Sequence, residues 1–142
     1  MSTVIKNWDK NNWLSSKHYI LRFNNFLNRI NQLNSNTLIL DIGCGRGKII
    51  GSLSSKFNFK NKPIGIDLVS HKDRDKRIYF KKIDALSYFN KNKKKFDLIL
   101  VKQTIHLLKL NQIKTLLFKM KKSLNPNGKI LILTLDPFEN KI

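Results

Sequence analysis

Acidic residues are scarce in this sequence. The 142 residues include nine Asp or Glu against 28 Lys or Arg, which gives a formal net charge of +19. A strongly basic chain fits a polyanionic partner such as nucleic acid. Lysine makes up most of the excess and occurs with many Asn and Ile residues, a combination that AT-rich codons encode. Arginine, which is better suited to reading phosphates and base edges, occurs only five times. A functional origin and a compositional origin of the charge both stay open.

Cysteine and long apolar runs are also lacking. Cys44 is the single cysteine, so a disulfide within the chain is excluded and we expect a reducing, cytoplasmic compartment. No apolar run approaches the ~20 residues of a membrane span, and residues 1–13 contain no apolar signal region. His18, His71 and His106 are scattered without the spacing of metal ligands, so no metal site is expected.

The most informative stretch is residues 37–50, TLILDIGCGRGKII. It reads as a buried strand, an acid, a glycine-rich turn and the start of a helix. The third glycine, Gly47, comes one residue too early for the G-x-G-x-x-G dinucleotide pattern, which would need a glycine at Lys48. Asp41 at the strand end would repel a pyrophosphate, but it can hold a cationic group such as an amino-acid ammonium.

The pattern hh-D-h-G-x-G-x-G in this stretch resembles motif I of the class I S-adenosylmethionine-dependent methyltransferases, and it is complete here. The resemblance covers about residues 8–134. It implies that S-adenosylmethionine (SAM) is the cofactor and S-adenosylhomocysteine (SAH) the product. It also implies that the cofactor is bound by the strand-end acid and the turn, that is, by Asp41, Gly43, Cys44, Gly45 and Gly47.

A second acid, Asp67, ends a short strand at residues 62–68 and lies twenty residues past Gly47. In the resembling family an acid at this place accepts hydrogen bonds from both ribose hydroxyls, because a carboxylate offers two acceptor oxygens to a vicinal diol. The neighbouring Leu68 joins the cofactor contacts that the resemblance implies, as does Val101 at the end of the fourth strand.

A third acid, Asp84, closes a strand at residues 78–83. The resemblance implies that Asp84 accepts from the adenine amino group and that the backbone N–H of Ala85 meets a ring nitrogen. Asp97 differs from these acids because it begins the fourth strand, at residues 96–101. Ligands of such sheets bind at the carboxyl ends of the strands, so we expect Asp97 to be structural.

The segment after the fourth strand, KQTIHLL, lies at the carboxyl edge and can face the transferred methyl group. His106 occupies a position where small-molecule members of the family often carry a histidine. It could act as a base or orient an acceptor. A histidine on a helix surface or at a helix cap is the alternative, and the sequence does not decide between the two.

Strand-like and helix-like segments alternate along the chain. Amphipathic or capped helices are expected at residues 15–32, 47–56 and 111–124, and a fifth strand at 129–135. This alternation predicts an α/β, doubly wound, mostly parallel five-stranded sheet with helices on both faces. The resemblance implies the strand order 3-2-1-4-5. We expect one domain, divided into an N-terminal arm and covering helix (1–35), a Rossmann-like core (36–135) and a tail (136–142).

The resemblance implies in-line transfer of the sulfonium methyl to an acceptor, which we expect to be a small molecule. The alternatives are an RNA or protein methyltransferase, favoured only by the charge, and a SAM-binding domain without catalysis. KQTI stands where amino-group methylases of nucleic acids carry an N-P-P-Y-type segment, which counts against that class. The family normally adds two strands after the fifth. We therefore expect the fifth strand to be an exposed edge that favours self-association. In the family the further strands usually help to wall the acceptor site, so we also expect weak cofactor binding and poor turnover.

Overall fold

The structure, a computed structural model, describes residues 17–30, 33–102 and 104–133. The strands within these ranges are β1 (Ile39–Ile42), β2 (Ile64–Asp67), β3 (Tyr79–Lys82), β4 (Phe96–Lys102) and β5 (Leu124–Leu133). The helices are α2 (Lys17–Ile30), α3 (Lys48–Phe57), α4 (Ala85–Lys91), the 3-10 helix η2 (Ile105–Leu107) and α5 (Leu110–Lys122). The expected arm and tail lie mostly outside the described residues.

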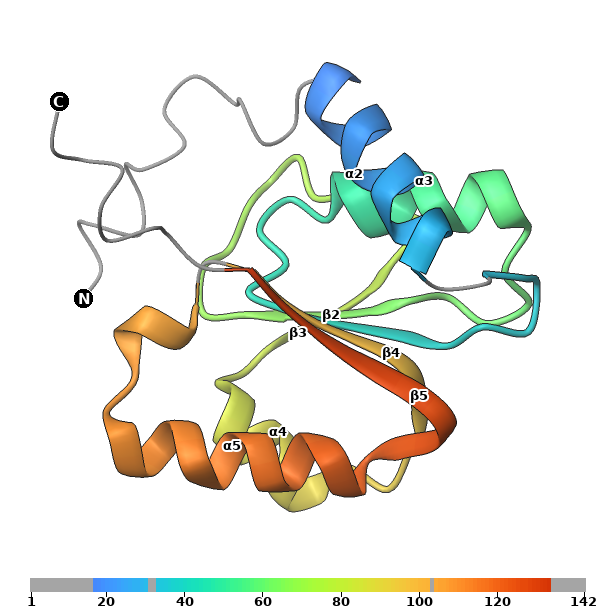
Figure 1. Cartoon of the computed structure of the whole chain (residues 1–142). Coiled ribbons are helices and arrows are strands. Elements are labelled where there is room, and N and C mark those ends of the chain that lie inside the picture. Colours follow the sequence, from blue (N-terminus) through green and yellow to red (C-terminus); the bar gives the residue numbers. More distant parts are fainter. Residues whose placement is uncertain (1–16, 31–32, 103, 134–142) are drawn as a thin grey trace, which may run out of the picture.

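The strands form one parallel sheet in the order β3-β2-β1-β4-β5. Helices α2 and α3 cover one face and α4 and α5 the other (Figure 1). The predicted doubly wound fold, the strand order and the leading helix are therefore confirmed. None of the helices in the described part of the chain has the length and apolarity needed to cross a bilayer.

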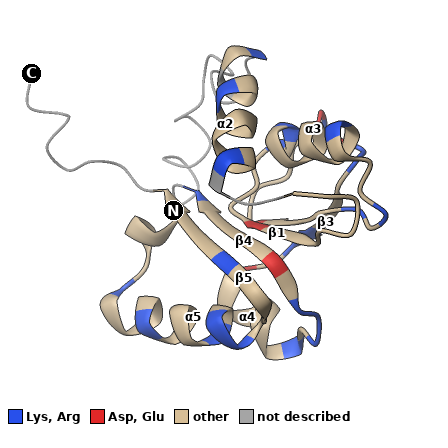
Figure 2. Cartoon of the chain, turned by 45° about the vertical axis from the view of Figure 1, so that its right-hand side comes forward, with Lys and Arg blue, Asp and Glu red and all other residues tan. Residues whose placement is uncertain are grey.

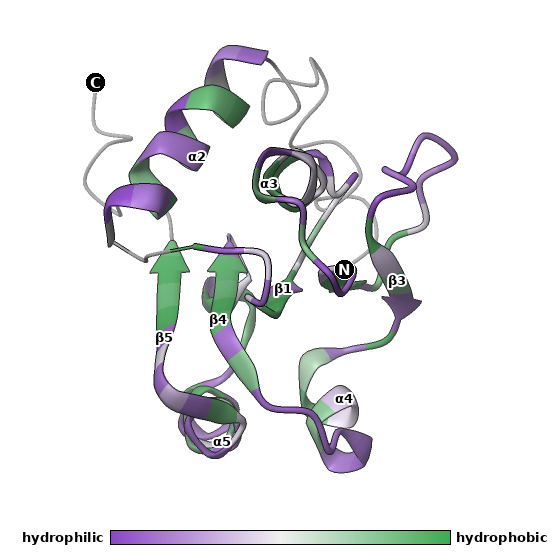
Figure 3. Cartoon of the chain, turned by 90° about the vertical axis from the view of Figure 1, so that its right-hand side faces the viewer, coloured by the Kyte–Doolittle hydropathy of each residue, from purple (hydrophilic) through white to green (hydrophobic). Residues whose placement is uncertain are grey.

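The sheet divides the hydrophobic core into two halves. Successive residues of β4 point to opposite faces, so Leu98 and Leu100 join the half under α2 and α3, whereas Ile99 and Val101 join the half under α4 and α5. All four of these side chains are fully buried. Figure 3 shows hydrophobic residues along the last parts of β4 and β5, as expected of strands in a sheet that is covered on both faces. On α2 hydrophobic and hydrophilic bands alternate, as expected of an amphipathic helix.

Helix α4 was not expected from the sequence, in which Asp84 closes a strand and a charged run begins at Asn90. Asp84 is the N-cap of this helix, and its Oδ1 accepts a hydrogen bond from the backbone N–H of Ser87 at 2.9 Å. Tyr88 and Phe89 of α4 are buried against the sheet. Seven residues are too few to show the hydrophobic periodicity of a helix, so the sequence did not predict α4.

Asp97 lies at the amino edge of the sheet, as expected. Its Oδ2 accepts from the backbone N–H of Leu38 at 2.7 Å, and its Oδ1 accepts from Nδ2 of Asn125 at 3.0 Å. The carboxylate thereby ties the chain entering β1 to β4 and β5. Strand β5 begins at Leu124, earlier than predicted, and runs through the expected turn, where Asn127 has φ 63°. Within the described residues β5 pairs only with β4, so it is an edge strand.

Candidate functional site

The candidate site lies where the carboxyl ends of β1, β2 and β4 meet. From β1 the chain continues to β2 and β3 on one side of β1, and then crosses to β4 and β5 on the other side of β1. The strand order therefore reverses at β1. Ligands of doubly wound sheets bind at such a switch point, outside the carboxyl ends of the strands. Asp41 in β1, Asp67 in β2 and Lys102 in β4 converge there, together with the glycine turn that follows β1.

The glycine turn is fastened to β2 through its backbone. The N–H groups of Gly43 and Cys44 both donate to the carbonyl of Ile66, at 2.9 and 3.1 Å, and Gly47 N–H donates to the carbonyl of Cys44 at 2.9 Å. This pairing extends the β1–β2 contact beyond the strands. The turn is therefore a rigid surface whose position is set by the sheet.

Gly43, Gly45 and Gly47 all have left-handed backbone conformations, with φ of 73°, 54° and 73°. A Cβ on Gly43 would lie 2.1 Å from Oγ1 of Thr104, and one on Gly47 would lie 2.4 Å from Cδ1 of Ile78. Packing within the protein therefore requires these two glycines. A Cβ on Gly45, in contrast, would have no heavy atom within 4 Å. Gly45 thus presents its backbone to open space, where a ligand can approach it.

Asp67 links the end of β2 to the glycine turn. Its Oδ2 accepts from the backbone N–H of Gly45 at 2.8 Å, and its Oδ1 accepts from the N–H groups of Leu68 at 2.7 Å and Val69 at 3.1 Å. An ionised carboxylate offers about four acceptor positions. Three are used within the protein, which leaves about one for a ligand donor. That is less than the pair of ribose hydroxyls that the family resemblance implied.

Asp41 is fully buried at the end of β1. Its Oδ2 lies 2.7 Å from Nζ of Lys102, whose side chain is only 11% exposed. The short distance defines an ion pair, although neither oxygen of Asp41 accepts a well-aligned hydrogen bond from the described residues. Burial raises the pKa of Asp41, the Lys102 ammonium opposes this rise, and the charge of Asp67 adds to it.

Cys44 points into the protein and not toward the open side of the turn. Its sulfur fills the space over Gly65, where a Cβ would lie 2.8 Å away, and Nη1 of Arg74 lies 3.5 Å from it. Burial raises the pKa of Cys44 to about 12, so the thiol stays protonated at neutral pH and is a poor nucleophile. Arg74 is itself fixed by the carbonyl of Val69, at 2.6 Å, and by the ring of Phe80, 3.3 Å from its guanidinium carbon.

The remaining predicted residues lie around this centre. Asp84 is exposed after β3, and hydrogen bonding to the side chain and the backbone N–H of Ser87 lowers its pKa. Ala85 is the first residue of α4, and Leu68 is 42% exposed beside Asp67. The Val101 side chain, in contrast, is buried in the core under α4 and α5.

His106 lies on η2, four residues past Lys102, with an exposed side chain. Between them, the hydroxyl of Thr104 donates to the carbonyl of Lys102 at 2.9 Å and stands against Gly43. Thr104, in the segment after β4, therefore covers one end of the glycine turn, and His106 follows two residues later on η2.

Sequence reasoning missed Lys102, Thr104 and Arg74. For Lys102 a signal was present, because the order 3-2-1-4-5 places the ends of β1 and β4 side by side. A lone acid after one apolar strand and a lone lysine after its neighbour then form a pair. For Arg74 and Thr104 we find no comparable signal, because their contacts depend on the path of two loops.

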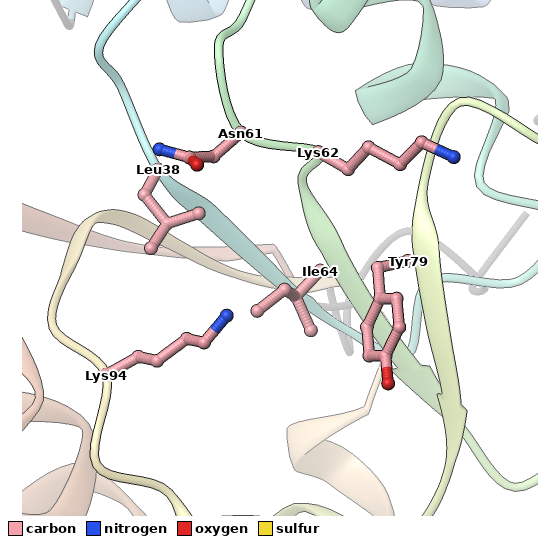
Figure 4. Close-up of a pocket in the computed structure, with 6 residues that line it drawn as sticks. All are labelled: Leu38, Asn61, Lys62, Ile64, Tyr79 and Lys94. Carbon is pink, nitrogen blue, oxygen red and sulfur yellow. The ribbon is translucent and has the colours of Figure 1, made fainter.

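A pocket of about 360 Å³ lies at the other end of the strands, where their amino ends meet. Its walls are Leu38, Asn61, Lys62, Ile64, Tyr79 and Lys94, drawn in Figure 4. These residues belong to the amino ends of β1, β2 and β3 and to neighbouring loops. The pocket is therefore separate from the glycine turn and from all the predicted site residues.

The fold and the glycine turn define a Rossmann-like methyltransferase domain. A family model described as a methyltransferase domain matches residues 33–140, and the chain belongs to this family. A comparison with curated proteins gave no significant match.

Solved structures share the fold at low sequence identity. A SAM-dependent methyltransferase from Archaeoglobus fulgidus aligns over 83% of this chain and 54% of its own, with 22% identity and a TM-score of 0.63. PKMT2 from Rickettsia typhi, in complex with AdoHcy, aligns over 70% of this chain and 21% of its own, with 22% identity and a TM-score of 0.59. A SAM-dependent methyltransferase from Thiobacillus denitrificans, in complex with SAH, aligns over 82% and 48%, with 17% identity and a TM-score of 0.60. The chain spans about half the length, or less, of these proteins.

Proposed function

We propose that this chain binds SAM at the carboxyl ends of β1, β2 and β3 and serves methyl transfer to a small-molecule acceptor. The observation that carries the proposal is the open side of Gly45 on a turn whose amide is held by Asp67. The membership of the chain in the methyltransferase-domain family supports it.

The order of the acids along the sheet fits an elongated ligand of three parts. Asp41 lies near the end of β1, Asp67 ends β2 and Asp84 follows β3, and these three strands are neighbours in the sheet. Adjacent strands lie about 4.8 Å apart. Asp41 would take the amino-acid ammonium, the remaining acceptor position of Asp67 a ribose hydroxyl, and Asp84 with the N–H of Ala85 the adenine edge.

The other predicted cofactor contacts are made either by the backbone or by apolar side chains. The glycine turn would offer its backbone groups at Gly43, Cys44 and Gly47. The Cys44 side chain would not contact the cofactor, because it points inward. Leu68, exposed beside Asp67, would cover an apolar surface of the ligand. Val101 would contribute only through the end of the strand, because its side chain is in the core.

SAM supplies an activated sulfonium methyl when bound, so this chain mainly needs to position the reactants. The buried Cys44 thiol is unsuited to covalent catalysis. His106, exposed on η2 beyond Lys102, would orient the acceptor or take its proton.

One sequence feature argues against an amino-group methylase of nucleic acids. The segment that begins with the last residue of β4 reads KQTI and not N-P-P-Y. The basic charge is the feature that would favour a nucleic-acid acceptor. Figure 2 shows Lys and Arg on α2, α3, α5 and β5 and in the loops, and the last turn of α5 carries Lys119, Lys121 and Lys122.

Calorimetry with SAH and with NAD tests cofactor choice, and we expect binding of SAH alone. Incubation with methyl-labelled SAM and a metabolite extract, followed by untargeted mass spectrometry, then identifies the acceptor class. Label appearing only in RNA, with salt-dependent RNA binding, would replace the small-molecule acceptor by RNA. SAH binding without transfer to any pool would leave a binding domain, and tight NAD binding would overturn the proposal.

A further inference from the structure

Lys102 closes off the carboxylate that the cofactor's ammonium would need. Both oxygens of Asp41 are buried, and Nζ of Lys102 lies 2.7 Å from Oδ2. Asp41 has no other cationic contact among the described residues. A ligand ammonium can therefore reach Asp41 only if the Lys102 side chain moves aside.

Lys102 is well placed for such a movement. It is the last residue of β4, at the ligand edge of the sheet, and its side chain retains 11% exposure. Lysine is a flexible four-carbon stem with a compact ammonium. The ammonium of an amino-acid ligand has the same charge and the same three donors, so the two groups can replace one another on one carboxylate.

We propose that Lys102 is an internal substitute for the cofactor's ammonium: the two cations alternate on Asp41, and cofactor binding expels Lys102 toward the acceptor side. The inference rests on the proposed function, because it assigns to Asp41 the amino-acid end of SAM or SAH. Only the molecules in which Lys102 has left Asp41 can bind the cofactor's ammonium. The apparent affinity for the cofactor is therefore the intrinsic affinity multiplied by the fraction of molecules in which Asp41 is free.

The expelled ammonium would stay near the end of β4, beside the segment that leads to η2 and to the proposed acceptor. Lys102 would then present a positive charge to the acceptor only after the cofactor is in place. Anionic acceptors, such as carboxylates or phenolates, would be favoured in that order of binding.

The first experiment follows Lys102 in the unaltered protein. The lysines are acetylated under limiting conditions with and without saturating SAH, and each site is quantified by mass spectrometry. We expect several-fold faster modification of Lys102 when SAH is present. Lys114, exposed on α5, serves as the control and should not change. Equal or slower modification of Lys102 in the presence of SAH would overturn the proposal.

A ligand without an ammonium gives the matched control. 5′-Methylthioadenosine carries the adenine, the ribose and the thioether of SAH but lacks its amino-acid end. At saturation it should leave Lys102 modification unchanged. Faster modification with this nucleoside as well would mean that Lys102 responds to the nucleoside and not to the ammonium, which contradicts the proposal.

The second experiment uses Lys102→Met, with Lys102→Arg as the variant that keeps the cation. We expect Lys102→Met to bind SAH about tenfold more tightly than the unaltered protein at pH 8.5, and Lys102→Arg no more tightly. An alkaline pH is chosen because burial and the charge of Asp67 raise the pKa of Asp41, and Lys102→Met lacks the ammonium that opposes this rise; the Cys44 thiol also lies near Asp41. Unchanged or weaker SAH binding by folded Lys102→Met would overturn the proposal. Failure of every form to bind SAH would instead overturn the proposed function and this inference with it.

Discussion

The backbone N–H of Gly45 donates to Oδ2 of Asp67 at 2.8 Å. One carboxylate thus ends β2 and also holds the turn that follows β1. The end of β2 and the glycine turn are therefore coupled, and a substitution of either residue should change the position of the other.

We expect Asp67→Ala to weaken SAH binding by about 1–3 kcal/mol, or roughly 5- to 150-fold, because it removes a charged acceptor and frees the Gly45 amide. Calorimetry measures the change. Asp73→Ala is the control, since Asp73 is an exposed acid paired with Arg46 near the same loop. Unchanged SAH affinity in Asp67→Ala would remove Asp67 from the site.

Gly45→Val should abolish SAH binding while the domain stays folded. Apart from its chain neighbours, no protein atom lies within 4 Å of the added Cβ, so we expect the main cost to the fold to be that of a left-handed residue that is not glycine, about 1–2 kcal/mol. Gly43→Ala makes the contrast, because its Cβ would meet Thr104 and should lower the unfolding temperature further. Circular dichroism and titration separate the two effects, and tight binding by Gly45→Val would show that the turn does not cradle the cofactor.

His106→Ala should reduce methyl transfer by about 10²-fold or more if the side chain is a general base, with SAH affinity nearly unchanged. The residue is exposed on η2, beyond the strand end that carries Lys102. His18→Ala, on the exposed face of α2, controls for the loss of a histidine. Loss of SAH binding in His106→Ala would contradict its position on the acceptor side, and full transfer would leave it a surface histidine.

Asp75→Asn should lower stability by about 1–3 kcal/mol at pH 7. Burial raises the pKa of Asp75, but hydrogen bonds from the Arg77 side chain and backbone outweigh burial and lower it. A lowered folded-state pKa means that Asp75 stabilises the fold above about pH 4, and that this contribution is lost as the pH falls through the folded-state value. Thermal unfolding of both proteins should therefore converge at acidic pH; a constant difference would exclude the ion pair as its cause.

We also propose that two copies of the chain pair along β5. This strand is an edge among the described elements, and its last residues, Ile130 to Leu133, are apolar and only half-buried. Such an edge invites pairing with another chain. Light scattering should detect a concentration-dependent dimer, and Ile130→Lys should shift it toward monomer. A stable monomer with full transfer activity would show that the five strands suffice.

The parts of the fold that the sequence predicts are those with a local signature. The run before Asp41 and the glycines after it define a strand and a turn without knowledge of the rest. Helix α4 has no such signature in seven residues, and its cap, Asp84, was interpreted only as a ligand contact. The pairing of Lys102 with Asp41 depends on two strands about sixty residues apart in the chain becoming neighbours. The assignments of Asp67, Asp84 and His106 to ligand contacts remain predictions.

The bond from Leu38 N–H to the Asp97 carboxylate joins residues 59 positions apart in the chain. Strand β1 therefore cannot complete its pairing until most of the chain has been synthesised and has closed a long loop, which makes that step entropically costly. Strands β1, β2 and β3 are close in sequence and can associate earlier. The half of the domain that carries Asp41 and Asp67 should thus acquire protection from hydrogen exchange first, with the β4 side of the site following as folding completes.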